Sequence, residues 1–201
     1  MPSPIDAQQR RLEITNASIR ILARGGASAL TLKSLAEELG GSITLVTHFV
    51  ANRQQLFVAI TDELIASYEA ELASIDDGLG GYDRLRALLL WMAPTTPQDI
   101  ESEAGRIALI SQRAGHDAIS HFFDAMEEIM RTMLRIRLVG LVGDDELGSA
   151  VAYLRAVVNG LTLSAVEHPG MWPESAVEQA VDRALRGLGL AADEHMLPDG
   201  A

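Results

Sequence analysis

Five residues with hydroxyl or basic side chains lie in one short stretch of the chain. Thr31 and Ser42 each stand where a run of helical periodicity begins, and Lys33, His48 and Arg53 lie near them. The free N–H groups and the dipole at a helix N-terminus favour an anion, and basic side chains bind phosphate oxygens. The stretch therefore predicts binding of a phosphate backbone.

The residues that follow Ser42 predict how bases would be read. Outward positions on this short segment fall to Ile43, Thr44, Leu45 and Thr47. Their methyl and hydroxyl groups suit thymine methyls and polar base edges. No Arg, Asn or Gln lies among them, so we expect sequence preference to depend on apolar contacts, DNA shape and minor-groove insertion of Arg10 or Arg11. Val46 is expected in the core, while periodicity leaves Leu45 open between the core and the DNA.

No pattern in the chain predicts catalysis. There is no cysteine, no Gly-x-Ser-x-Gly, no phosphate-binding Gly-Lys loop and no dinucleotide-binding glycine motif between a strand and a helix. His116 and His121 would point about 140° from each other on a helix, so they would not share a metal ion. Asp117 and His121 have a spacing more typical of a solvated pair. We therefore expect no enzyme, metal site or cofactor.

The elements that would position the candidate residues are three consecutive helices. Residues 1–9 predict a mobile arm, and a helix over 11–24 ends at the glycines that follow it. Thr31 caps a second helix that Gly40 closes, and Ser42 opens a third of only about seven residues. A helix that short is not stable alone, and two helices joined by a tight glycine turn are typical of a helix-turn-helix.

The rest of the chain also predicts helices and no strands. Asn52 and Gln55 form a cap for a helix of about twenty residues, and further helices are expected over 82–92, 98–113, 116–141, 147–166 and 173–188. The segment 147–166 carries one charge, Arg155. A helix so apolar must be buried on both sides, which favours a homodimer through the last two helices. The alternative is that both helices fill their own core.

Charge and composition distinguish the two ends of the chain. Residues 1–60 hold six basic and four acidic residues, a net of +2, whereas the remainder holds ten basic and 24 acidic residues, a net of −14. This indicates a small anion-binding module attached to an acidic region, although the acids would also suit a solvated face. The absence of cysteine, the polar N-terminus and the short longest apolar run, Ala87–Ala93, favour a cytoplasmic protein without a membrane span.

Residues 14–56 resemble the DNA-binding domain of the TetR family of bacterial repressors. The matching residues are Ile14, Ala17, Ile21, Gly26, Thr31, Leu35, Ala36, Gly40, Ser42, Val46, Arg53 and Leu56. Farther on, the stretch from Val158 to Leu161 resembles the family's motif in the helix that forms the dimer. The chain departs from the family at Thr47, where Tyr is usual, at Val50, where Phe is usual, and at Gly41 in the turn. Phe49 is expected to supply the missing aromatic packing.

The resemblance implies an all-α protein with three parts. These are a helix-turn-helix DNA-binding domain over 1–51, a larger helical domain over 52–190 that binds an effector and dimerises, and a flexible tail over 191–201. A homodimer would bind a palindromic operator in double-stranded DNA and be released by a small hydrophobic or aromatic effector. Pocket candidates are Trp91, Met92, Phe122, Met126, Met130 and Trp172, which ordinary core packing would also explain. The alternative function is a helical adaptor that binds only protein.

Overall fold

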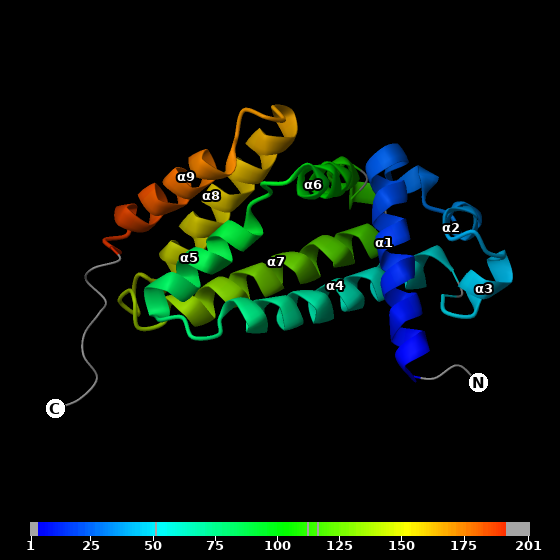
Figure 1. Ribbon diagram of the computed structural model, residues 1–201, viewed down its shortest axis with the longest axis horizontal. Helices are drawn as coiled ribbons and strands as arrows, with labels where there is room; N and C mark the ends of the chain where they lie inside the picture. The colour runs from blue at the N-terminus through cyan, green and yellow to red at the C-terminus, as the bar shows by residue number, and fades with distance from the viewer. Residues whose placement is uncertain (1–3, 51, 112, 116, 192–201) are drawn as a thin grey trace. The chain divides into compact units, whose positions relative to one another are not determined.

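The computed structural model describes residues 4–50, 52–111, 113–115 and 117–191 of the 201-residue chain. These residues form α-helices joined by short turns, as the sequence predicts (Figure 1). The helices are α1 (Pro4–Ala29), α2 (Leu32–Glu38), α3 (Ile43–Thr47), α4 (Arg53–Ile75), α5 (Gly81–Met92), α6 (Pro97–Ile110), α7 (Asp117–Leu138), α8 (Leu147–Glu167) and α9 (Glu174–Gly187).

The first helix is longer than its sequence pattern indicates. It begins at Pro4, so the prediction that residues 4–9 belong to an arm is wrong. Proline suits the first turn of a helix, where its missing N–H has no partner to lose. At the other end, Gly26 adopts φ 65° and ψ −172°, the left-handed break expected from the sequence, and one more helical turn follows it to Ala29.

Two other predicted helices end earlier in the structure. The helix expected to reach Arg113 stops at Ile110 and is followed by a separate 3₁₀ turn over Arg113–Gly115. The helix expected to reach Leu141 stops at Leu138. There the chain turns through an isolated bridge between Val139 and Val142, and apolar residues inside this turn had extended the helical pattern.

The chain divides into two compact units. The first comprises residues 1–69 and 101–127, the second residues 70–100 and 128–201, and their boundaries fall within α4, α6 and α7. The predicted tail lies outside the described residues except for Ala191. The boundary expected between residues 51 and 52 divides the DNA-binding domain from the domain that binds an effector and dimerises. This division by function stays a prediction.

A single hydrophobic core holds the first unit together. Its buried residues come from the first four helices, the loops between them and the nearest turns of α6 and α7, and they include Ile14, Ala17, Ile21, Leu30, Leu35, Ala36, Val46, Val50, Leu56, Phe57, Ile60, Leu109 and Ile119. The fourth helix starts as predicted, because the Asn52 side-chain oxygen accepts from the N–H of Gln55 at 2.9 Å.

In the second unit, α8 packs against α5 and α9, which also contact each other. The Arg86 side chain on α5 donates to Asp182 on α9 at 2.6 Å, and Arg137 on α7 binds Asp76 at the end of α4. Of the helices that the structure describes, α8 is long and apolar enough to cross a membrane by length and composition alone. It has no long uninterrupted apolar run because polar residues interrupt it, but these are mostly small and uncharged, so the mean hydropathy of the helix stays high. The expected absence of a membrane span stays a prediction.

Candidate nucleic-acid interface

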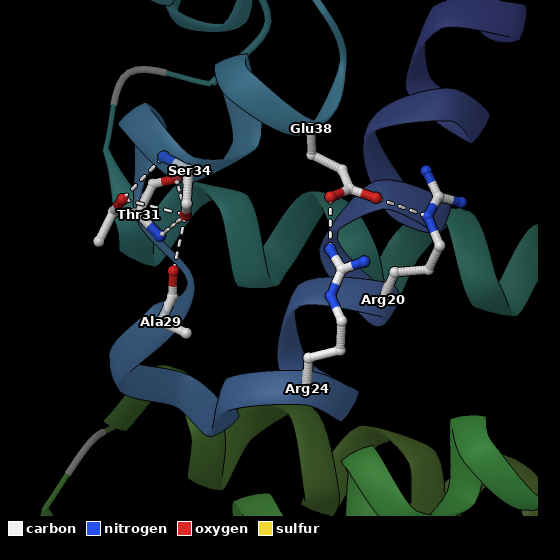
Figure 2. A network of polar contacts seen from close by, with 6 residues as sticks. All are labelled: Arg20, Arg24, Ala29, Thr31, Ser34 and Glu38. Carbon is white, nitrogen blue, oxygen red and sulfur yellow. Dashed lines mark hydrogen bonds and ion pairs between the residues drawn. The ribbon is translucent and has the colours of Figure 1, made fainter.

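The second helix is anchored at its first turn by hydrogen bonds that include two side-chain hydroxyls. The Thr31 hydroxyl oxygen accepts from the Ser34 N–H, and the Ser34 hydroxyl oxygen accepts from the Thr31 N–H, both at 3.0 Å. The Ser34 hydroxyl also donates to the Ala29 carbonyl at 2.6 Å, which ties the helix to the end of α1 (Figure 2). Thr31 is therefore the predicted N-cap, within a capping box in which serine takes the place of the usual Glu or Gln.

The turn between α2 and α3 closes as the sequence predicts. Gly40 has φ 63°, and its N–H donates to the Glu37 carbonyl at 3.1 Å, while the Gly41 N–H donates to the Ala36 carbonyl at 3.0 Å. These two bonds form a Schellman motif, which satisfies carbonyl groups that a helix end leaves without partners. The turn therefore has a defined geometry, and α3 leaves it in a defined direction.

The third helix separates its residues into a buried and an exposed side. Val46 is 1% exposed and Val50, just past the helix, is 3% exposed, so the expectation that Val46 is core is confirmed. Phe49 is half-buried against the same core, as expected for the aromatic packing. Ser42, Ile43, Thr44 and Thr47 are exposed, and Ile43 keeps 48% of its surface in solvent. An exposed isoleucine between exposed hydroxyl groups gives this helix the mixed surface expected for base contacts.

The basic candidates are distributed around these two helices. Lys33 is exposed on α2, with its ammonium 3.9 Å from a carboxylate oxygen of Glu37. His48 is exposed, and its ring meets the Phe49 ring edge to face at 5.4 Å between centroids. The side chains of Leu45 and Arg53 lie outside the described part of the chain.

The arginines expected to enter a minor groove belong to α1. Arg10 lies within the helix and pairs with Glu13 one turn later at 2.5 Å, and the Arg11 side chain lies outside the described part. Arg10 was expected at the end of a mobile arm over residues 1–9, but it lies in a helix that begins at Pro4 and has an acidic partner there. Its contact with DNA stays a prediction.

Sequence reasoning missed an ionic cluster that joins α1 to α2. The Arg20 Nε donates to one carboxylate oxygen of Glu38 at 2.9 Å, and the Arg24 guanidinium donates to the other (Figure 2). These hydrogen bonds, first from Arg20 and then from Arg24, lower the pKa of the Glu38 carboxyl. The available signal was two arginines one helical turn apart, but the acid that binds them lies 14 and 18 residues away.

The six effector-pocket candidates fall into both units. Phe122 and Met126 are buried in the first unit. Trp91, Met92, Met130 and Trp172 are half-buried in the second. Their common role as a pocket stays a prediction.

Of the two histidines considered for a metal site, one lies within the described residues. His121 is exposed on α7, and His116 lies outside the described residues. No group of three or more His, Cys, Asp or Glu side chains that could hold a metal ion occurs among the residues the structure describes.

Comparison with known proteins identifies regulators of transcription. The family profile described as "BetI-type transcriptional repressor, C-terminal" matches residues 81–190. The HTH-type transcriptional regulator PksA of Bacillus subtilis is 24% identical over 180 residues, which cover 84% of each chain. The HTH-type transcriptional repressor AcnR of Corynebacterium jeikeium is 28% identical over 194 residues, covering 93% of this chain and 97% of that protein.

Solved structures share the fold along almost the whole chain. A transcriptional regulator from Rhodococcus sp. Rha1 aligns with a TM-score of 0.75 at 22% identity, covering 90% of this chain and 98% of that one. A regulator from Saccharomonospora viridis in complex with choline aligns at 0.69 with 15% identity, covering 89% and 96%. The multidrug binding protein EbrR complexed with malachite green aligns at 0.58 with 17% identity, covering 88% and 98%.

Proposed function

The chain belongs to the TetR family of helix-turn-helix transcriptional regulators, which are not enzymes, and from this premise we propose that it is a cytoplasmic, homodimeric repressor. It binds a palindromic operator and leaves it when a small effector binds. The observation that carries the proposal is α3, a helix of five residues that exposes Ile43, Thr44 and Thr47 while Val46 lies in the core. A helix held by its neighbours and exposed on one side suits entry into the major groove.

The proposed DNA contacts divide into two kinds. Ile43, Thr44, Leu45 and Thr47 contact base edges, with the apolar side chains against thymine methyls. Thr31, Lys33, Ser42, His48 and Arg53 contact phosphates, which fixes the position of the protein without reading sequence. With so few basic residues and an acidic remainder of the chain, binding depends on each phosphate contact and weakens steeply with salt.

The proposed dimer forms through α8 and α9. One side of α8 is buried in its own chain, whereas Ala152, Tyr153, Ala156, Gly160 and Leu163 are exposed on the other. Tyr153 and Leu163 keep 43% and 45% of their surface in solvent. A second copy of this helix would cover these residues, since small side chains allow two helices to approach closely. A two-fold dimer places the recognition helices on half-sites roughly 34 to 36 Å apart, or a multiple of that.

The dimer is tested by adding a large side chain where the monomer has room for one. Apart from the neighbouring backbone of its own helix, no atom lies within 4 Å of the position that a Cβ on Gly160 would take, and a Cβ on the exposed Gly115, outside α8 and α9, would also meet no atom within 4 Å. We expect Gly160→Arg to fold and run as a monomer on a sizing column, while the control Gly115→Arg remains a dimer. A dimeric Gly160→Arg variant would contradict the proposed interface.

The proposed effector is hydrophobic or aromatic, and organic cations are the first class to test. Choline and malachite green, bound in two structures of this fold, are both cations. In this chain, the net negative charge lies outside residues 1–60 and would attract a cation, as would the faces of aromatic side chains. The effector shifts the protein toward release only if it binds the released state more tightly than the DNA-bound state.

The two tryptophans of the chain, Trp91 and Trp172, are both pocket candidates, so intrinsic fluorescence reports on the effector site. We expect choline or malachite green to change the fluorescence and to lower DNA affinity, and Trp91→Phe and Trp172→Phe to separate the two contributions. If neither choline nor malachite green changes the fluorescence or the DNA affinity, this effector class is excluded.

The DNA-binding proposal is tested with duplexes that the wild-type protein selects from genomic DNA. Replacing both Thr44 and Thr47 with alanine should lower affinity for the selected duplex about thirtyfold or more, since each of the two lost base contacts costs roughly 1–3 kcal/mol. Thr132→Ala, an exposed threonine on α7, is the matched control and should leave affinity unchanged. If the wild type binds no duplex even at low salt, the adaptor function replaces the repressor.

A further inference from the structure

Glu38 on α2 forms ion pairs with two arginines of α1. Each of its carboxylate oxygens accepts from a different arginine, Arg20 at 2.9 Å and Arg24 from the next turn of α1. Glu38 keeps 21% of its side-chain surface exposed, whereas Arg20 and Arg24 keep 52% and 57%. The carboxylate is thus the covered member, and both of its acceptor oxygens are in use.

Local preferences do not explain why these residues stand where they do. Glu38 is the last residue of α2, where the helix dipole disfavours a negative charge, and the last turn of α2 has no basic residue. Arg20 and Arg24 are four residues apart on one helix, a spacing at which like charges repel. Each unfavourable placement becomes favourable only when α1 and α2 meet, so the three residues function as a unit.

This unit completes the attachment of α2 at both of its ends. The first turn is held to Ala29 through the Ser34 hydroxyl, and the last residue is held to α1 through Glu38. Between the two attachments, Leu35 and Ala36 lie in the core. Two polar attachments at opposite ends of a seven-residue helix fix the direction of its axis, which the apolar packing of Leu32, Leu35 and Ala36 alone would leave less well defined.

The direction of α2 determines the direction of α3. The Schellman motif runs from Ala36 to Gly41 and so includes Glu38, and α3 itself has only five residues. Such a helix does not hold its own orientation in water. Its backbone bonds from the His48 N–H to Thr44 at 3.2 Å and from the Val50 N–H to Val46 at 3.0 Å depend on the neighbouring elements staying in place.

We propose that Arg20, Glu38 and Arg24 form a clamp that positions the recognition helix for sequence-specific binding and makes no DNA contact itself. The proposal rests on the proposed function and names a positioning residue, Glu38, that lies outside the expected contact surface. Exposed ion pairs contribute little to global stability, so the clamp is expected to act on orientation more than on folding. Base contacts require close geometry and are sensitive to orientation, whereas non-specific phosphate binding is much less so.

The adjacent residue provides a matched control. Glu37 is exposed, removal of its charge is the same substitution, and its nearest cation is Lys33 at 3.9 Å on its own helix. We expect Glu38→Gln to lower affinity for the selected duplex about tenfold, while Glu37→Gln leaves it unchanged or raises it slightly. For a scrambled duplex of the same composition, both variants should behave alike, because both remove one negative charge near the DNA.

A second set of variants separates positioning from direct phosphate contact. Replacing Arg20 and Arg24 together with glutamine should lower affinity for the selected duplex as Glu38→Gln does, and adding Glu38→Gln to that pair should lower it no further. If the two arginines contact phosphates instead, their loss reduces the slope of scrambled-duplex affinity against salt by about one per lost contact, and the clamp proposal is overturned. Arg24→Lys keeps the charge and should give an intermediate loss, so the proposal is still tested if Glu38→Gln fails to fold.

Hydrogen exchange of the DNA-free protein distinguishes failure of the clamp from failure of the proposed function. In Glu38→Gln, the His48 and Val50 amides should exchange faster than in Glu37→Gln. Equal exchange and equal operator affinity in the two variants would overturn the clamp while the repressor proposal stands. A wild-type protein that selects no duplex would overturn the repressor proposal and, with it, any DNA-reading role for the clamp.

Discussion

Val46 offers a quantitative test of how the recognition helix is held. It lies in a five-residue helix and is 1% exposed in the core of the first unit. Val46→Ala removes two methyl groups from that core, at about 0.8 kcal/mol each for transfer, and a term for the cavity is added. We therefore expect the free energy of unfolding to fall by about 2 kcal/mol.

The matched control is Val58→Ala on α4, where the valine is 38% exposed. Both substitutions replace valine with alanine in a helix, so the gain in helix propensity is the same, and only burial differs. Urea denaturation of both variants measures the difference in the free energy of unfolding. Among the side chains of α3 that the structure describes, Val46 is the buried one, so Val46→Ala should also weaken operator binding and speed exchange of the Val50 amide. Equal stability and equal DNA affinity in the two variants would refute this account of how α3 is held.

Three further predictions concern charge. Asp76→Ala leaves Arg137, whose side chain is 8% exposed, without its carboxylate partner and should destabilise the fold by about 1–3 kcal/mol, the cost of a buried donor left unsatisfied, whereas the exposed neighbour Asp77→Ala should change the urea midpoint little. Arg20 and Arg24 lower the pKa of Glu38 below 4.5, so the contribution of the Glu38 carboxylate to stability is present at higher pH and is lost as pH falls through that lowered pKa. The difference in Tm between wild type and Glu38→Gln should therefore shrink at low pH, and a difference that stays constant would contradict this prediction. Affinity for a random duplex should fall steeply in a salt titration, and salt-independent binding would exclude phosphate contacts as its main source.

Much of the fold was predictable because the determining signals are local. Thr31, Gly40 and Asn52 mark helix ends through hydrogen bonds within a few residues, and the structure confirms all three. The burial of Val46 followed from the spacing of apolar residues along its own segment. Local signals failed where helix ends depend on weaker preferences, as at Pro4 and Leu138.

What the sequence by itself determined is the all-helical fold and the surface of the recognition helix, because caps, glycine turns and apolar spacing act over one or two helical turns. Only the tertiary structure decided how that helix is positioned. The clamp joins Glu38 to arginines 14 and 18 residues earlier, and no local pattern relates charges at such separations. Their partnership exists because α1 and α2 pack together, and that packing follows from the shared core.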